Sequence, residues 1–200
     1  MKTEQQGFGL IEVMVSLLIL AIAVLGFTAM QGQAIKATDE SLERTQSLIM
    51  MRNMGEKIRV NPTAITSYQT AINTPAATLP AKTCGLSGTM DACNATELAV
   101  AEAYFFTQSM SKRGFTVNLQ PCPSTGGQVN TNIMYSWCLI SAWGDTRPTI
   151  GTDTKTKDTE EGESTDGKMD CLTSQSEADS KVTKGGKYHS GATCMFMEIT

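Results

Sequence analysis

Residues 8–27 read FGLIEVMVSLLILAIAVLGF, an apolar stretch that contains a single ionisable side chain, Glu12. The only other clearly polar residue of this stretch is Ser16. A carboxylate in the interior of a bilayer costs about 2 to 3 kcal/mol on insertion scales, so an ionisable group within such a stretch is a candidate functional residue. Glu12 is therefore the first candidate site in the chain, and its charge requires a partner.

The stretch is long enough to cross a membrane once. About 20 residues in a helix match the roughly 30 Å hydrocarbon core of a bilayer, whereas later apolar runs have only the length of a buried strand. A cleaved secretory signal is the alternative, since Lys2 supplies a positive charge and residues 21–23 resemble a signal peptidase site. Glu12 and the apolar residues after Ala23 argue against that alternative, and we expect a single-pass chain.

Beyond residue 27 the sequence has the periodicity of an amphipathic helix. Apolar side chains that recur at intervals of two to seven residues are predicted to face the core: Ile35, Leu42, Ile49, Met51, Met54 and Ile58. The helix should run from Phe8 to about Val60, because Pro62 disfavours helical geometry at Asn61. We divide it into a transmembrane half, 8–27, and an amphipathic half, 28–61.

Residues 62–200 are numerous enough for one globular head with its own core. The formal net charge of −4 and the pI near 5.1 argue against electrostatic binding of nucleic acid by the whole domain, although a local basic patch remains compatible with them.

Six cysteines all lie after the apolar stretch. An even number on the far side of a membrane segment indicates disulfides in an oxidising compartment. Zinc is the rival explanation, but the cysteines lack the close spacing of zinc ligands and the chain has one histidine. Several connectivities are open, and we expect the one that closes the shortest loops: Cys84–Cys93, Cys122–Cys138 and Cys171–Cys194.

The head is predicted to be a small α+β unit. Residues 61–93 show little periodicity and are expected to be irregular, whereas Asn94 and Glu97 fit a capping box that begins a short helix. This helix should end near Gly114. One face of it is predicted to follow Leu98, Ala101 and Phe105, and then Gln108 or Ser109.

Apolar and polar residues alternate over residues 115–119, which predicts a half-buried strand. Apolar residues occupy both faces of residues 132–143, as in a central strand, and residues 194–199 are predicted to form the last strand. We expect an antiparallel sheet of three or four strands with one face on the long helix.

Residues 151–170 mix acidic residues with lysines and contain almost no apolar side chains, which predicts a solvated loop that includes Asp170. A calcium site is the alternative, but the spacing matches no EF-hand loop. His189 lies in a glycine-rich segment and is predicted to be an exposed loop residue. No nucleophile elbow accompanies it, so we expect no catalytic residue, no metal and no cofactor.

The start of the chain resembles a type IV prepilin: a short leader ending in Gly7, an aromatic Phe8, Glu12 as the fifth residue after the leader, and a long apolar helix. The resemblance implies that residues 1–7 are a leader. A prepilin peptidase would cut between Gly7 and Phe8 and methylate the amino group of Phe8. It also implies that Glu12 pairs with the N-terminal amine of a neighbouring subunit. That pairing would offset much of the desolvation cost of both charges.

Within this superfamily the sequence is most similar to the minor pilins called type IV pilus modification protein PilV. The features that carry this similarity are residues 9–26, Gln31, residues 59–62, the segment between Cys84 and Cys93, and residues 143–145. Ala29 occupies a position where many major pilins have a kinking proline, which argues against a major subunit.

The resemblance implies a pilin fold and a minor pilin that takes part in type IV pilus assembly, in a priming complex near the fibre tip. Its partners would be the prepilin peptidase, other minor pilins and the major pilin. It would be inserted in the inner membrane with a periplasmic head before assembly into the extracellular pilus. A minor pseudopilin of a type II secretion system is the alternative, because its N-terminus would look much the same.

Overall fold

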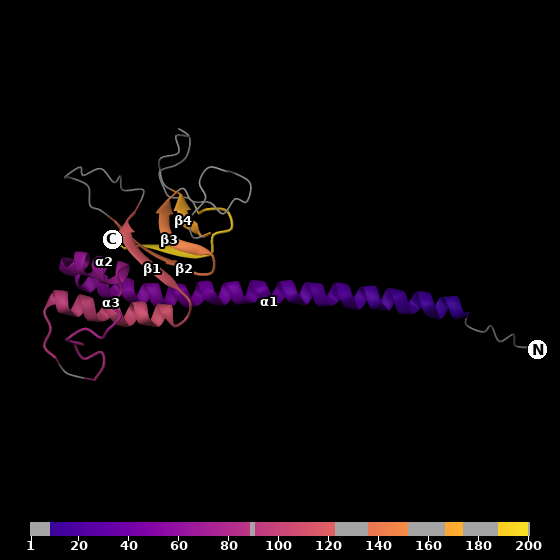
Figure 1. Ribbon diagram of the computed structural model, residues 1–200, viewed down its shortest axis with the longest axis horizontal. Helices are drawn as coiled ribbons and strands as arrows, with labels where there is room; N and C mark the ends of the chain where they lie inside the picture. Colours follow the sequence, from indigo (N-terminus) through magenta and orange to yellow (C-terminus); the bar gives the residue numbers. More distant parts are fainter. Residues whose placement is uncertain (1–8, 89–90, 123–135, 152–166, 174–187, 200) are drawn as a thin grey trace, which may run out of the picture. The chain divides into compact units, whose positions relative to one another are not determined.

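The structure, a computed structural model, describes residues 9–88, 91–122, 136–151, 167–173 and 188–199 (Figure 1). The chain divides into two units, Met1–Glu43 and Arg44–Thr200, and α1 (Leu10–Val60) runs from the first into the second. The elements that follow α1 are η1 (Pro62–Ala64), α2 (Ile65–Asn73), α3 (Ala95–Ser111), β1 (Thr116–Pro121), β2 (Trp137–Ala142), β3 (Thr146–Gly151), β4 (Met169–Thr173) and β5 (Cys194–Ile199). The predicted α+β class is confirmed.

Helix α1 is continuous over 51 residues, as the sequence predicts. It ends next to Pro62, where the backbone N–H of Asn61 donates to the carbonyl of Lys57 at 3.2 Å and the chain tightens into the 3-10 helix η1. Lys57 and Arg59 lie in its last turn, where positive charge is favourable beside the unpaired carbonyls. Pro62 therefore ends the helix without disturbing its last hydrogen bonds.

Only the last part of the amphipathic half of α1 is buried. Met51, Met54 and Ile58 are at most 3% exposed, as predicted. Ile35, Leu42 and Ile49 are 55 to 63% exposed, so the prediction that they face a core of this chain was wrong. They share the helical periodicity of the buried residues, but no other described segment of the chain covers them.

Helix α2 lies within residues 61–93, which we expected to be irregular, so that prediction was wrong for this part. Tyr68 and Ile72 are four residues apart on one face and are fully buried. Threonines around them weaken the helical signal, because β-branched residues have low helix propensity. The packing of these two apolar side chains outweighs that local preference.

Helix α3 begins at the predicted capping box. Asn94 accepts a hydrogen bond from the backbone N–H of Glu97 at 2.8 Å, and the Glu97 carboxylate accepts one from the Asn94 N–H at 3.0 Å. The predicted buried face was correct only in part, since Leu98 and Phe105 are half-buried. The apolar residues that are buried include four others: Ala99, Ala103, Phe106 and Met110.

The predicted antiparallel sheet has three strands in the order β1-β2-β5. Leu139 of the central strand pairs with Leu119 of β1 and with Met197 of β5. Five of the six residues of β2 are buried, as expected for a strand covered on both faces. The last strand has the predicted bounds.

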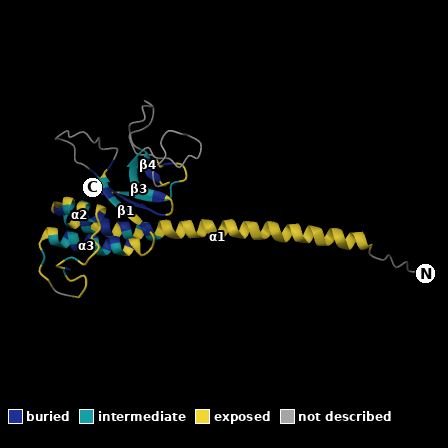
Figure 2. Ribbon diagram, in the orientation of Figure 1, coloured by how far each residue is buried: buried dark blue, intermediate teal, exposed yellow. Residues whose placement is uncertain are grey.

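Two apolar cores cover the two faces of this sheet (Figure 2). On one face α2, α3 and the end of α1 pack against residues such as Leu119, Leu139 and Ile199. On the other face Cys138, Ile140 and Ala142 join residues of β4 and β5. Neighbouring residues of β2 thus contribute to different cores, which follows from the alternation of side chains along a strand.

Strands β3 and β4 form a second, parallel pair that the sequence did not predict. The expected solvated loop at 151–170 was wrong for its last residues, because β4 begins at Met169 and Asp170 is 5% exposed. Asp170 accepts a hydrogen bond from the hydroxyl of Thr149 and lies 3.4 Å from the guanidinium of Arg147. These polar partners make burial of the carboxylate possible. Residues 152–166 lie outside the described part of the chain.

The six cysteines form Cys84–Cys93, Cys122–Cys138 and Cys171–Cys194. The second links the segment after β1 to β2, and the third links β4 to β5. The third therefore joins the two sheets covalently.

The prediction for His189 was wrong, because this residue is 8% exposed. Its Nε2 atom is 3.1 Å from the carbonyl oxygen of Gly151, and its backbone N–H donates to the carbonyl of Cys171 at 3.2 Å. His189 thus contacts β3 through its imidazole and β4 through its backbone N–H, and so joins the two strands. The local sequence around His189 does not reveal contacts with strands that are distant in the chain.

Candidate functional site

The candidate site is the first part of α1, and its N-terminal end positions Glu12. The helix begins after Gly9, whose carbonyl accepts the backbone N–H of Glu12 at 3.0 Å and that of Val13 at 3.5 Å. Glu12 lies in the first turn, where a negative charge is favourable beside the unpaired N–H groups. Its side chain is exposed, and no described residue forms an ion pair with it.

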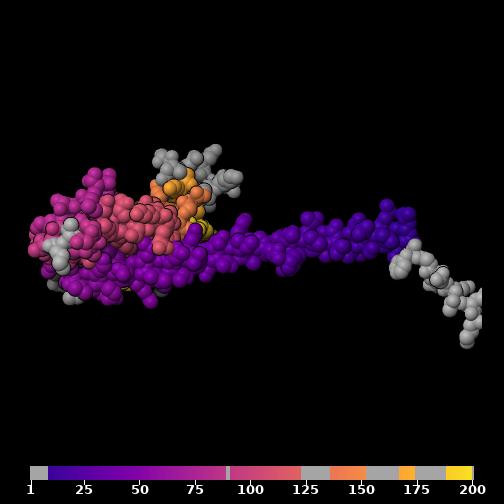
Figure 3. Space-filling view, turned by 90° about the horizontal axis from the view of Figure 1, so that it is seen from below, coloured from indigo at the N-terminus to yellow at the C-terminus, as the bar shows by residue number. Residues whose placement is uncertain are grey.

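From Gly9 to Ile35 the only ionisable side chain is Glu12. Every residue in this stretch is exposed, including Leu10 at 77% and Leu25 at 69% (Figure 3). α1 is long and apolar enough to cross a membrane, judged by its length and composition. A helix that is apolar on all sides requires an apolar environment of lipid or other helices.

The hydroxyl groups of this stretch are satisfied within the helix itself. Ser16 donates to the carbonyl of Val13 at 2.8 Å, and Thr28 donates to the carbonyl of Leu25 at 2.9 Å. A hydroxyl placed in an apolar environment without a hydrogen bond costs on the order of 2 kcal/mol or more. Both side chains avoid that cost, which leaves Glu12 as the polar group whose charge needs a partner.

Comparison with protein families agrees with this geometry. Residues 2–28 match the model of the prokaryotic N-terminal methylation motif, and residues 29–104 match the Tt1218-like model, described as type IV pilin Tt1218. The chain has a type IV pilin fold. The two matches run without a break from residue 2 to residue 104, so they cover the whole of α1, the segment after it and the first part of α3. No curated protein and no solved structure gave a match.

The residues predicted for processing fall within the first of these matches. Gly7 and Phe8 lie outside the described residues, whereas Glu12 lies at the start of α1. The N-terminal methylation motif implies processing by a prepilin peptidase and pilin partners in a fibre. It also fits a membrane-anchored pilin that is later assembled into a pilus, while the separate roles of the three residues remain predictions.

A buried polar cluster in the head escaped the sequence analysis. Tyr68 of α2 is fully buried and donates to a carboxylate oxygen of Glu102 at 2.5 Å, while Lys57 of α1 lies 3.5 Å from the other oxygen. Burial, followed by the hydrogen bond to Glu102, raises the pKa of Tyr68 well above its ordinary value. The cluster joins three helices, and its only sequence signal was the glutamate within the apolar pattern of α3.

The pilin family is structural rather than enzymatic. Within the described ranges no group of histidine, cysteine, aspartate or glutamate side chains has the arrangement of a metal site. His189 contacts backbone carbonyls instead of a nucleophile.

Proposed function

We propose that this protein is a minor pilin that takes part in type IV pilus assembly, as a member of a priming complex near the fibre tip. The observation that carries the proposal is the match to the N-terminal methylation motif at the start of a continuous apolar helix. The subgroup most similar in sequence is type IV pilus modification protein PilV. Before assembly, α1 anchors the protein in the inner membrane and the head lies in the periplasm, where disulfides form.

Glu12 is proposed to bind the N-terminal amine of a neighbouring subunit after cleavage between Gly7 and Phe8 and methylation of Phe8. Helix α1 supports this role because Glu12 is the only ionisable residue up to Ile35. In an apolar environment a carboxylate and an ammonium attract each other strongly and offset part of the cost of removing both from water. A subunit with an unpaired Glu12 would enter a fibre less readily.

A minor rather than a major subunit is supported by Ala29, which stands within the continuous helix α1 where many major pilins have a kinking proline. The helix contains no proline before it ends at Val60, so nothing in its sequence forces a kink. A minor pseudopilin of a type II secretion system remains the alternative, because the N-terminal methylation motif would apply equally to it. Deletion of the gene should abolish or reduce surface pili. Loss of protein secretion with normal pili would favour the alternative.

Replacement of Gly7 by Ala tests the processing step. We expect the variant to keep its leader, because the resemblance to prepilins implies a cut directly after a glycine. Mass spectrometry of the purified chain measures this directly. A mature chain that begins at Phe8 in the variant would contradict the proposed cleavage site.

Glu12→Gln tests the assembly contact, with Ser16→Ala as the matched control. The first change removes the charge from the apolar segment, and the second removes a hydroxyl that bonds only within the helix. We expect Glu12→Gln to reduce the amount of the protein in sheared fibres by about tenfold, which corresponds to a loss of about 1.4 kcal/mol. Ser16→Ala should be incorporated normally. Equal incorporation of both variants would show that Glu12 is not an assembly contact.

A further inference from the structure

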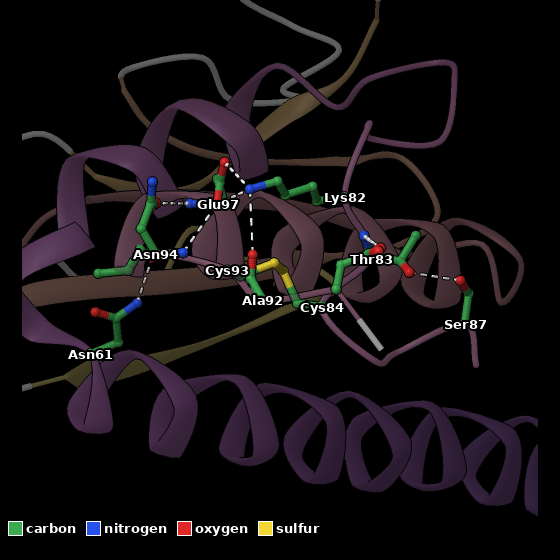
Figure 4. Close-up of a disulfide and its surroundings, with 11 residues drawn as sticks. Asn61, Lys82, Thr83, Cys84, Ser87, Ala92, Cys93, Asn94 and Glu97 are labelled. Carbon is green, nitrogen blue, oxygen red and sulfur yellow. Dashed lines mark hydrogen bonds and ion pairs between the residues drawn. A yellow bond between two sulfur atoms is a disulfide. The ribbon is translucent and has the colours of Figure 1, made fainter. Parts of the chain in front are cut away.

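The three disulfides have different surroundings. Cys122, Cys138, Cys171 and Cys194 are all at most 3% exposed and belong to the core on the far side of the sheet. Cys84 and Cys93 are half-buried and belong to neither core (Figure 4). A soluble thiol can therefore approach this pair while the head remains folded, whereas the other two pairs are shielded by packed side chains.

The backbone at Cys84 is in an unfavourable conformation. Among the described residues, Cys84 is the only one other than glycine with a positive φ, which is 54°. This left-handed conformation brings the β-carbon of an L-residue close to the following carbonyl oxygen. Gly85 follows with a φ of 81°, so the chain turns sharply at this point. The hydrogen bond from the Leu86 N–H to the Thr83 carbonyl at 2.9 Å also holds this turn, so opening the disulfide removes one of the restraints that keep Cys84 in this conformation.

The contacts around the disulfide do not depend on it. The ammonium group of Lys82 is 2.8 Å from the carboxylate of Glu97 and donates to the carbonyl of Ala92 at 3.3 Å (Figure 4). Asn94 and Glu97 cap α3 through their own hydrogen bonds. Both ends of the segment thus remain attached to α3 after reduction, and the opening stays local.

We propose that Cys84–Cys93 is a thiol–disulfide exchange site that accepts electrons from a dithiol reductant. A thiolate of the reductant attacks one sulfur, the Cys84–Cys93 bond breaks, and the other cysteine leaves as a thiolate. The second thiolate of the reductant then attacks the mixed disulfide, which releases both cysteines in the reduced form and the reductant as a disulfide. Two electrons pass to the cysteine pair, and two protons restore the thiols at neutral pH.

Loop length indicates which disulfide the head can lose with the smallest change in stability. The separation is 9 residues for Cys84–Cys93, against 16 for Cys122–Cys138 and 23 for Cys171–Cys194. In the chain-entropy description a shorter closed loop restricts the unfolded chain less, so its removal affects stability least. Exposed and strained disulfides are also the ones that exchange most readily. Exposure and backbone strain both point to the same pair.

The test uses the full chain in detergent, treated with increasing concentrations of dithiothreitol. Free thiols are trapped with an alkylating reagent, peptides that contain each cysteine are measured by mass spectrometry, and tryptophan fluorescence follows the fold of the head. We expect Cys84 and Cys93 to be half-reduced at a dithiothreitol concentration at least about tenfold lower than the other four, a difference in two-electron potential of about 30 mV. Fluorescence should remain native at that point.

Two variants serve as controls. Cys84→Ser/Cys93→Ser should leave the fluorescence of the head native and remove the first reduction step. Cys84→Ala/Cys93→Ala separates the loss of the disulfide from any effect of the new hydroxyls. Reduction of a buried pair first, reduction of all three pairs together, or unfolding of the head with the first step would each overturn the proposal.

Discussion

Replacement of Tyr68 by Phe should destabilise the head, because it removes one hydroxyl from a fully buried site that joins three helices. The ring of Phe fills the same space, so the change removes the hydroxyl that donates to Glu102 and leaves the packing of the ring in place. That bond has a carboxylate acceptor whose other oxygen is paired with Lys57 at 3.5 Å. After the substitution Glu102 keeps its ion pair but loses its second partner in a site that is almost closed to water.

The magnitude follows from this geometry. A hydrogen bond to a charged group contributes about 1.5 to 3 kcal/mol. In a chain of this size 1 kcal/mol shifts the melting temperature by roughly 2 to 4 °C. We therefore expect Tyr68→Phe to lower the melting temperature by about 3 to 12 °C at neutral pH, measured by circular dichroism of the full chain in detergent.

The same residue should affect stability at alkaline pH. An unfolded tyrosine loses its proton near pH 10, at about its ordinary pKa, whereas burial and the Glu102 hydrogen bond keep Tyr68 protonated in the folded head. The folded state then binds more protons than the unfolded state. The contribution of Tyr68 to stability is complete below about pH 10 and falls above it, by up to about 1.4 kcal/mol per pH unit. The Phe variant lacks this titrating group, so its stability should fall less steeply as the pH rises above about 10.

Tyr104→Phe is the matched control. Tyr104 is half-buried on α3 and packs edge-on against Phe105, and its hydroxyl has no hydrogen-bond partner among the described residues. We expect its melting temperature to lie within about 2 °C of the wild type, as for a change outside any buried network. The reasoning is wrong if the two variants have the same melting temperature. It is also wrong if the stability of Tyr68→Phe falls above about pH 10 as steeply as that of the wild type.

Three further substitutions test the head. Asn94→Ala removes the N-cap of α3 and should lower the free energy of unfolding by about 0.5 to 2 kcal/mol, measured by chemical denaturation. Asn53→Ala, at an exposed position of α1, is the control and should leave that free energy unchanged. Met54 is 1% exposed, so Met54→Ala should lower the free energy of unfolding by about 2 to 5 kcal/mol and lower the melting temperature of the head. Met30 is 72% exposed, so Met30→Ala should leave that melting temperature unchanged. Asp170→Asn should cost about 1.5 to 3 kcal/mol through its loss of charged hydrogen bonds, and an unchanged denaturation midpoint would contradict that role.

Local signals in the sequence predicted the elements that depend on local interactions. The capping box at Asn94 and Glu97 is complete within four residues, and Pro62 acts on the residue next to it. Alternation along β1 reflects a strand with one buried face. These patterns predict where an element begins and which side chains share a face. The start of α1 was equally clear, because its length and lone acid are properties of the sequence itself.

Properties that depend on distant segments were not predictable in this way. Ile49 and Met51 lie on the same helix, but only Met51 is covered by other parts of the head. Asp170 and His189 are buried because β3 and β4 pair in parallel across a long separation, which the charged composition around them does not reveal. Periodicity identifies a face of an element, and only the tertiary structure shows what covers it.

Ser16 and Thr28 form their hydrogen bonds within the helix. The apolar segment therefore needs no polar partner for these hydroxyls in either lipid or a bundle of helices. Its backbone and hydroxyl groups keep the same partners whether lipid chains or neighbouring helices surround it. Movement of the segment between these environments therefore changes the energy of one ionisable group above all, that of Glu12. In the proposed assembly, the free energy of transfer from the bilayer to the fibre therefore depends mainly on Glu12. The rest of the segment contributes little to the difference between the two environments.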